Sequence, residues 1–544
     1  MTPPRVRDDA EEAVRYDAEG TVRYDAEGVH AVLADLDRPC YIVTSGTRVG
    51  ATSRPPAPGD GLTALAAVAP QPPDRLGSAA FRRHHGVRYA YMTGAMAGGI
   101  ACEELVVAAA RAGHLASFGA AGLPEDRIDT ALERLERTLG TGVPYACNLI
   151  HSPMAPGQER ATVDACLRHH VRCVEASAFI QLTPDLVRYR LTGLHRDPGP
   201  PGVRAEHRII AKVSRLETAE LFLRPPPPEL TAALLAEGCV SSEQCELART
   251  VPLADDITVE ADSGGHTDRR PLTALLPAVV RLRDRVAREH PAAARVRVGA
   301  AGGIGTPEAV VGALALGAAY VVTGSVNQAA TEAGTSPAVK RLLATAGLAD
   351  CTMAPAADLF EQGVTVQVLA RGTMFPGHAT RLYRLYRDHD SLAALPPAER
   401  RNLEQRILRR PLDEVWHDTS GYLAAHHPSW HERAERDHKF RMAMVFRWYL
   451  AMASRWAVTG QGDRQRDWQV WCGPAMGAFN AWTAGTALAD PAHRQVTAIA
   501  HHLLHGAAYH ARVTQLRLAG VHLPAACAHY RLPPAGARLP SGST

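Results

Sequence analysis

The sequence predicts an α/β fold, a (β/α)8 TIM barrel with a C-terminal mainly helical extension. Eight short apolar segments, many of them β-branched, recur along residues 89–323. Most are followed by a stretch with the pattern of a crossover helix, and the span of about 235 residues suits such a barrel. A doubly wound sheet is the alternative, but its G-x-G-x-x-G fingerprint is missing between the first strand and helix.

The predicted strands and helices alternate along the chain. Strands are expected at 89–93, 115–118, 145–150, 173–176, 209–213, 257–260, 296–299 and 320–323. Helices are expected at 103–112, 124–139, 160–169, 228–236 and 306–316. This order places 81–330 in one barrel.

The ends of the chain have a different character. Residues 1–80 predict an arm and linker: a loose N-terminal segment with the repeat VRYDAEG at 14–20 and 22–28, a small β-rich segment at 40–43, and a Pro/Gly/Ala-rich linker at 51–74. Residues 331–525 predict a mainly helical substrate or carrier-protein subdomain, with helices at 380–388, 397–409 and 440–457, and 526–544 a tail. The helical part is rich in arginine: Arg381, Arg384, Arg387, Arg401, Arg406, Arg409 and Arg410. These residues form either a solvated helix face or a docking surface for an acidic partner.

Composition excludes several classes of protein. The 544 residues are 46% hydrophobic, which is typical of a globular chain. Lys+Arg 59 against Asp+Glu 56 gives a net charge of +3, so nucleic acid is not the expected partner. The start has no apolar signal region and no apolar run is long enough for a membrane span. Ten scattered cysteines without C-x-x-C indicate reduced thiols and no metal site, so we expect a cytoplasmic protein.

Reacting groups in a barrel lie at the carboxyl ends of the strands. After the first strand comes GAMAGGI at 94–100, whose Ala95, Met96 and Ala97 let a flat group approach the backbone. Strand three carries Asn148. Strand five carries Lys212, which favours an anionic or electron-rich ligand because a buried lysine is costly without a partner.

The sixth strand ends in EADSGGHTD at 260–268, and we expect His266 to be catalytic there. Gly264 and Gly265 before it allow close backbone approach to a ligand. GAAGGIG at 299–305 and TGSV at 323–326 follow strands seven and eight, where barrels commonly bind phosphate. These loops supply Gly302, Gly303, Gly324 and Ser325. Together with Met96, Asn148 and Lys212, they predict an FMN site.

These residues resemble the FMN-dependent nitronate monooxygenase (2-nitropropane dioxygenase-like) superfamily. The closer resemblance is to PfaD-type trans-acting enoyl reductases of polyunsaturated fatty acid and trans-AT polyketide synthases. It is carried by EADSGGHTD, VQVLARGTMF at 366–375, MVFRWYL at 444–450 and WQVWCGPAMGAFN at 468–480. Two departures stand out: Gly377-His378 replaces an expected arginine-containing stretch, and the VRYDAEG repeat lies outside the family pattern.

The resemblance implies reduction of the α,β double bond of an enoyl thioester on an acyl carrier protein, with FMN and NADPH. His266 would polarise the carbonyl or supply a proton, with Asp268 or Glu260 orienting it. Glu260 would also belong to the cofactor site, and a homodimer is allowed. Two alternatives stay open: a nitronate monooxygenase, in which the same histidine abstracts a proton, and a flavin-free scaffold within a synthase.

Overall fold

Eight parallel strands close into a barrel in the computed structural model, which describes residues 22–151, 156–199 and 202–536. The order around the barrel is β10-β11-β12-β13-β4-β5-β6-β7. The strands are β4 (Tyr91–Thr93), β5 (Leu115–Phe118), β6 (Ala146–Ile150), β7 (Cys173–Ser177), β10 (Arg208–Val213), β11 (Asp256–Glu260), β12 (Arg297–Ala301) and β13 (Val321–Thr323). All eight coincide with the predicted strands within a few residues, so the barrel prediction is confirmed.

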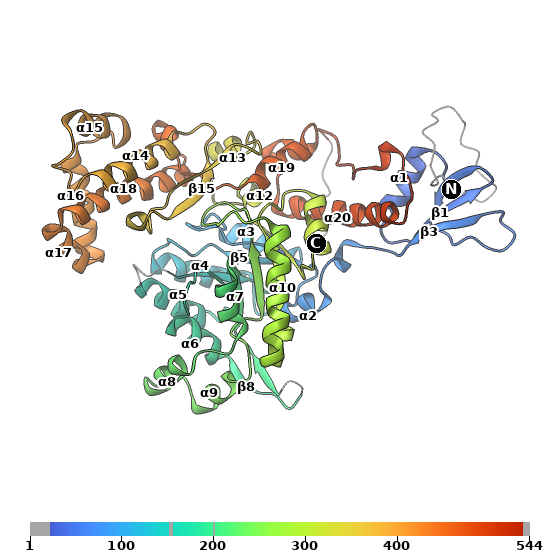
Figure 1. The fold of residues 1–544 in the computed structure, drawn as a ribbon, viewed down its shortest axis with the longest axis horizontal. Coiled ribbons are helices and arrows are strands. Elements are labelled where there is room, and N and C mark those ends of the chain that lie inside the picture. The colour runs from blue at the N-terminus through green and yellow to red at the C-terminus, as the bar shows by residue number, and fades with distance from the viewer. Residues whose placement is uncertain (1–21, 152–155, 200–201, 537–544) are drawn as a thin grey trace.

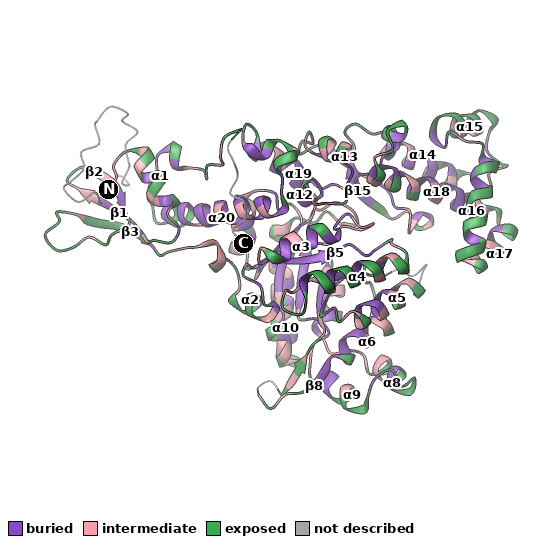
Figure 2. Ribbon diagram, turned by 180° about the vertical axis from the view of Figure 1, so that it is seen from behind, coloured by how far each residue is buried: buried purple, intermediate pink, exposed green. Residues whose placement is uncertain are grey.

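Helices surround the barrel strands, most of whose residues are buried (Figure 2). They are α3 (Glu103–Arg111), α4 (Glu125–Leu139), α5 (Pro156–Arg168), α6 (Pro184–Thr192), α7 (Leu216–Leu223), α8 (Pro228–Ala236), α9 (Ser242–Ala248), α10 (Leu272–Glu289) and α11 (Pro307–Ala315), with a hairpin of β8 (Leu194–Arg196) and β9 (Val203–Ala205). Helix α4 shows why such segments are helical: its leucines recur on one face and are buried, whereas its charged residues face solvent.

Helix α2 (Ala79–His85) closes the amino-terminal end of the barrel. Its Phe81 ring stacks on Tyr320 with ring centroids 4.2 Å apart. His85 Nε2 lies 2.7 Å from the carboxylate of Asp256, which also binds Arg297. These groups are buried at the first residues of β11 and β12. A ligand therefore has to enter from the opposite, carboxyl end.

The N-terminal region is more ordered than the sequence predicts. β1 (Cys40–Ser45) pairs with β2 (Arg48–Thr52) and β3 (Thr63–Val68), so the expected linker at 51–74 contains parts of two strands and that prediction is wrong there. The second VRYDAEG copy leads into α1 (Ala26–Ala34), and Asp25 accepts a hydrogen bond from the N–H of Gly28 as its N-cap. The prediction of a loose N-terminal arm is therefore wrong for the second copy. The first copy lies outside the described residues.

The region after the barrel is mainly helical, with one hairpin that the sequence analysis missed. Its elements are α12 (Ser325–Gln328), α13 (Pro337–Leu343), α14 (Phe375–Asp388), α15 (Pro397–Asn402), a π-turn (Leu403–Ile407), α16 (Leu412–His426), α17 (Pro428–Arg436), α18 (His438–Thr459), α19 (Pro474–Thr483) and α20 (Val496–Leu518). The hairpin consists of β14 (Cys351–Pro355) and β15 (Thr365–Leu369). Figure 1 shows α14 to α18 extending to one side of the barrel. No helix in the described ranges has both the length and the apolar composition needed to cross a bilayer.

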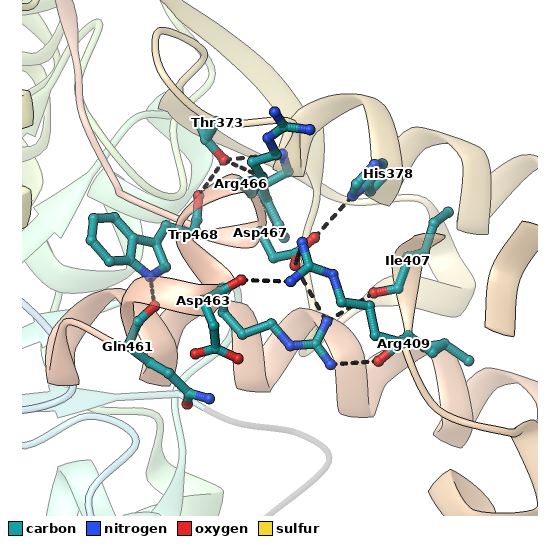
Figure 3. Close-up of polar contacts among 12 residues, drawn as sticks. Thr373, His378, Ile407, Arg409, Gln461, Asp463, Arg466, Asp467 and Trp468 are labelled. Atoms are coloured by element: carbon teal, nitrogen blue, oxygen red, sulfur yellow. Dashed lines mark hydrogen bonds and ion pairs between the residues drawn. The ribbon is translucent and has the colours of Figure 1, made fainter. Parts of the chain in front are cut away.

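A buried carboxylate ties this helical block together. Asp467 accepts hydrogen bonds from Tyr449 and Arg464. It also lies 3.1 Å from the Nδ1 atom of His378 (Figure 3). Burial would raise the pKa of Asp467, but the hydrogen bonds of these three side chains outweigh it and lower the pKa. His378, which departs from the resembled pattern, therefore lies in a structural cluster between α14 and α18.

Helix α20 connects the two ends of the chain. It packs along α11 and contacts α1. The fully buried guanidinium of Arg512 donates hydrogen bonds to the backbone carbonyls at the end of α1, namely those of Val32, Leu33, Asp35, Leu36 and Arg38. The carbonyls of Val32 and Leu33 lie in the last turn of α1, where helix carbonyls lack partners within the helix, and the other three follow it. Arg512 therefore supplies a C-terminal cap from almost 500 residues away.

Candidate active site

The buried charges predicted at the carboxyl end of the barrel lie together. Lys212 Nζ on β10 donates to Glu260 Oε1 at the end of β11, at 3.0 Å, and Ser263 donates to the same oxygen. Burial would lower the pKa of Lys212, but the charges of Glu260 and Glu175 outweigh it and raise the pKa. Lys212 therefore stays charged at the barrel mouth.

Glu175 on β7 is a site residue that the sequence analysis missed. Its buried carboxylate accepts a hydrogen bond from the N–H of Ala95 at 2.9 Å, which fixes the loop after the first barrel strand. Its backbone carbonyl accepts from Asn148 Nδ2 at 3.0 Å. In the same loop, the carbonyls of Met96 and Ala97 accept from N–H groups three to five residues on. The sequence feature that could have identified Glu175 is the presence of a glutamate inside an otherwise apolar strand, CVEAS at 173–177.

The two glycine loops leave open space where a phosphate fits. A Cβ atom on Gly303 or Gly324 would meet no heavy atom within 4 Å, and Gly303 has the left-handed φ of +72°. Gly302 is needed for another reason, because its Cβ would lie 2.7 Å from the backbone of Ala261. Among the described residues, the N–H groups of Gly303 and Ser325 have no acceptor. Gly303 precedes α11 and Ser325 begins α12, and free N–H groups at such positions are suited to an anion, so these loops fit the FMN phosphate.

The loop that carries His266 is held from outside the barrel. Gly265 pairs with Gln367 of β15 through two backbone hydrogen bonds of 2.9 and 2.8 Å. The buried amide of Gln367 donates to Asp262 Oδ1 and to the carbonyl of Ser263. On the other side, a Cβ on Gly264 would lie 2.9 Å from the backbone of Cys472. Hairpin β14–β15 therefore fixes the position of His266.

His266 pairs with Asp358, which follows β14. The Nε2 atom of His266 lies 3.1 Å from Asp358 Oδ2, and the two side chains are 39% and 48% exposed. Burial would lower the pKa of His266, but the hydrogen bond and charge of Asp358 outweigh it and raise the pKa above its ordinary value. The same pair lowers the pKa of Asp358 against the effect of its burial. The imidazole is thus favoured in its protonated form.

Neither of the two expected partners forms a hydrogen bond with His266, although the charge of Glu260 contributes to its raised pKa. The carboxylate of Asp268 binds Arg215 through two hydrogen bonds of 2.8 and 3.1 Å, and this contact lowers its pKa. Glu260 is engaged with Lys212. Asp358 takes the orienting position instead. It lies 92 residues after His266 in the sequence, so the sequence near His266 does not indicate this pairing.

The whole arrangement is suited to reduction of a polarised double bond. The open glycine loops, a charged lysine and an imidazole whose pKa is raised by a carboxylate lie at the same end of one barrel. A protonated imidazole can donate a hydrogen bond to an oxygen that gains negative charge, or can transfer a proton.

Three family models match the chain. "Nitronate monooxygenase" matches residues 83–374, which is more than half of it. "Fatty acid synthase subunit PfaD N-terminal domain" matches 18–70, and "[Acyl-carrier-protein] S-malonyltransferase, inserted helical domain" matches 389–468. The PfaD model includes residues 22–28, so the expectation that the VRYDAEG repeat lies outside the family pattern is wrong for the second copy.

Similar proteins come from fatty acid and polyketide synthases. One of the polyunsaturated fatty acid synthase subunits of Thraustochytrium sp. is 47% identical over 89% of this chain, and polyketide biosynthesis protein PksE of Bacillus subtilis is 42% identical over 79%. The chain spans 32% of the first relative's length and 56% of the second's. The crystal structure of the enoyl reductase domain of MlnA, from the macrolactin biosynthesis cluster of Bacillus amyloliquefaciens, is 38% identical with a TM-score of 0.78, covering 82% of this chain and 100% of that one.

Proposed function

Because the chain belongs to the nitronate monooxygenase family, in its PfaD-type group, we propose that it is a trans-acting enoyl reductase. Its substrate would be an enoyl thioester carried on an acyl carrier protein, in polyketide or polyunsaturated fatty acid biosynthesis. The similarity to synthase proteins and to the enoyl reductase domain of MlnA supports this proposal.

The observation that carries the proposal is the 3.1 Å pair of His266 and Asp358. Enoyl reduction needs a donor near the thioester oxygen and a proton at the α-carbon, and both tasks suit an imidazolium. A nitronate monooxygenase would need the same histidine as a base that abstracts a proton. The carboxylate of Asp358 raises the pKa of His266, which suits either role, and the similarity to the enoyl reductase domain of MlnA is what favours the reductase.

The remaining residues of the site would hold and orient the cofactor. Gly303, Gly324 and Ser325 would hold the FMN phosphate through backbone N–H groups and a hydroxyl, and Ala95, Asn148 and Lys212 belong to the same cofactor site. When bound, FMN would supply the hydride chemistry that links NADPH to the β-carbon of the substrate. His266 stabilises the negative charge on the thioester oxygen or protonates the α-carbon, which completes the addition of two hydrogens.

Anaerobic titration of the FMN-loaded protein with NADPH, followed by an enoyl thioester, tests this function. Bleaching of the flavin and its recovery on the thioester support the reductase. Recovery only with oxygen or a nitronate favours the monooxygenase. A protein that takes up no flavin favours the scaffold.

His266→Ala should keep bound FMN and lose most enoyl turnover, because the glycine loops that hold the phosphate remain. His417→Ala is the matched control, since His417 is exposed on α16. Turnover equal to that of the control would remove His266 from the reaction.

A further inference from the structure

A pocket of about 210 Å³ adjoins the pair of His266 and Asp358. Asp358 contributes to both, because its carboxylate contacts His266 and the residue also lines the pocket. The other walls come from the turn at Phe360–Gln362 and from helices α14, α17 and α18. The pocket thus lies within the helical block, on the side where Asp358 contacts His266.

Apolar and hydrogen-bonding groups line the pocket together. Leu359, Tyr386 and Phe440 offer apolar surface, and Gln362 offers an amide that both donates and accepts. Such a lining suits a flexible chain that contains methyl groups and amides, which is the composition of pantetheine.

The carboxylates in the wall already have partners. Glu361 lies 3.3 Å from Arg447, and Asp358 lies beside His266. Asp437 accepts a hydrogen bond from the N–H of Phe440 at 2.9 Å. The charges of Glu361 and Asp358 therefore have partners outside the pocket, whereas Asp437 is shared between this N–H group and Arg433.

Two cations of the wall keep binding capacity. Arg433 uses only Nη2 for a hydrogen bond, to Asp437 at 3.3 Å, and its side chain is 59% exposed over the Phe440 ring. Lys439, one of three lysines in the chain, donates to the carbonyls of Tyr386 and His389. Its nearest carboxylate, that of Asp390, is 3.8 Å away and fully exposed, so solvent screens it.

We propose that this pocket binds the phosphopantetheine arm of the carrier-borne thioester, with its phosphodiester at Arg433 and Lys439. This inference rests on the proposed enoyl reductase function, and it adds where the arm lies and which side chains select it. The neutral part of the arm would contact Tyr386 and Phe440 on the way to His266. Guanidinium and ammonium groups are the usual partners of such a phosphate.

Two thioesters of the same enoyl acid test the inference. One is the phosphopantetheine thioester, and the other is the N-acetylcysteamine thioester, which lacks the phosphate. The quantity measured is the ratio of their kcat/KM values. We expect the wild-type protein to prefer the phosphopantetheine thioester, and Arg433→Gln to reduce that ratio about tenfold, the loss expected for one charge-assisted hydrogen bond.

Arg436→Gln is the matched control, because Arg436 is an exposed arginine of the same helix that does not line the pocket. Lys439→Gln is a second variant with the same expected direction, and thermal unfolding of each variant checks its fold. An unchanged ratio in both pocket variants, or no preference in the wild type, overturns the inference while leaving the reductase function intact. Reduction of neither thioester by the wild type refutes the function itself and this inference with it.

Discussion

Replacing Asp358 with asparagine removes the charge beside His266 and keeps the size and hydrogen-bonding shape of the side chain. Without the carboxylate, the imidazolium loses its stabilising partner, so the pKa of His266 falls. If the protonated form of His266 is the active one, activity falls as pH rises through its pKa. Asp358→Asn should therefore shift this descending limb to lower pH.

The size of the shift follows from the geometry. Two unit charges 3.1 Å apart attract by about 1.3 kcal/mol in a water-like dielectric. That dielectric applies because both side chains are partly exposed. This energy corresponds to about one pH unit. Turnover of the variant should thus be near that of the wild type at low pH and about tenfold lower above the wild-type limb.

The assay is the pH dependence of kcat/KM for NADPH-dependent reduction of an N-acetylcysteamine enoyl thioester. Asp268→Asn is the control, because Asp268 binds Arg215 and its charge does not contact His266. A limb that stays in place in Asp358→Asn, or one that moves equally in Asp268→Asn, would refute the assignment of Asp358. Activity that rises with pH in the wild type would refute the protonated form of His266.

Three further changes test the cofactor loops and the framework. Gly324→Val fills space in which no protein atom lies. The free energy of unfolding of the apoprotein should therefore stay within about 0.5 kcal/mol of the wild-type value, while the flavin absorbance of the purified protein is lost. Retained flavin would place the phosphate elsewhere. Gln367→Ala removes the amide bonds to Asp262 and Ser263 and should cost about 1–3 kcal/mol in urea unfolding and lower turnover; unchanged turnover would mean that the loop positions itself. Asp467→Ala leaves the buried guanidinium of Arg464 without its carboxylate and should cost about 3–5 kcal/mol in urea unfolding; a loss below about 1 kcal/mol would contradict the role of this cluster.

The barrel was predictable because each of its strands is a short β-branched run followed by a helix. The glycine loops were predictable because their place after strands seven and eight is a property of the fold, not of local sequence alone. Lys212 and Glu260 were predicted as site residues on separate grounds, Lys212 as a buried lysine and Glu260 as an acidic residue at the end of a strand. Their 3.0 Å contact follows from the parallel pairing of β10 and β11.

The partner of His266 was not predictable in the same way. Asp268 is close in sequence, but Arg215 binds its carboxylate. Asp358 and Gln367 lie on a hairpin within a region that was expected to be helical. The alternating run at 364–369 carried a strand signal, yet only tertiary pairing with Gly265 shows that this hairpin belongs to the barrel mouth.

The cap that Arg512 places on α1 has a consequence for the order of events during synthesis. The carbonyls of Val32 and Leu33 in the last turn of α1 gain this donor only after the ribosome has added residue 512. Until that moment the N-terminal helix lacks its final anchor, so ribosome-bound chains that stop before α20 should be cleaved near residue 35 by a protease that spares the released protein.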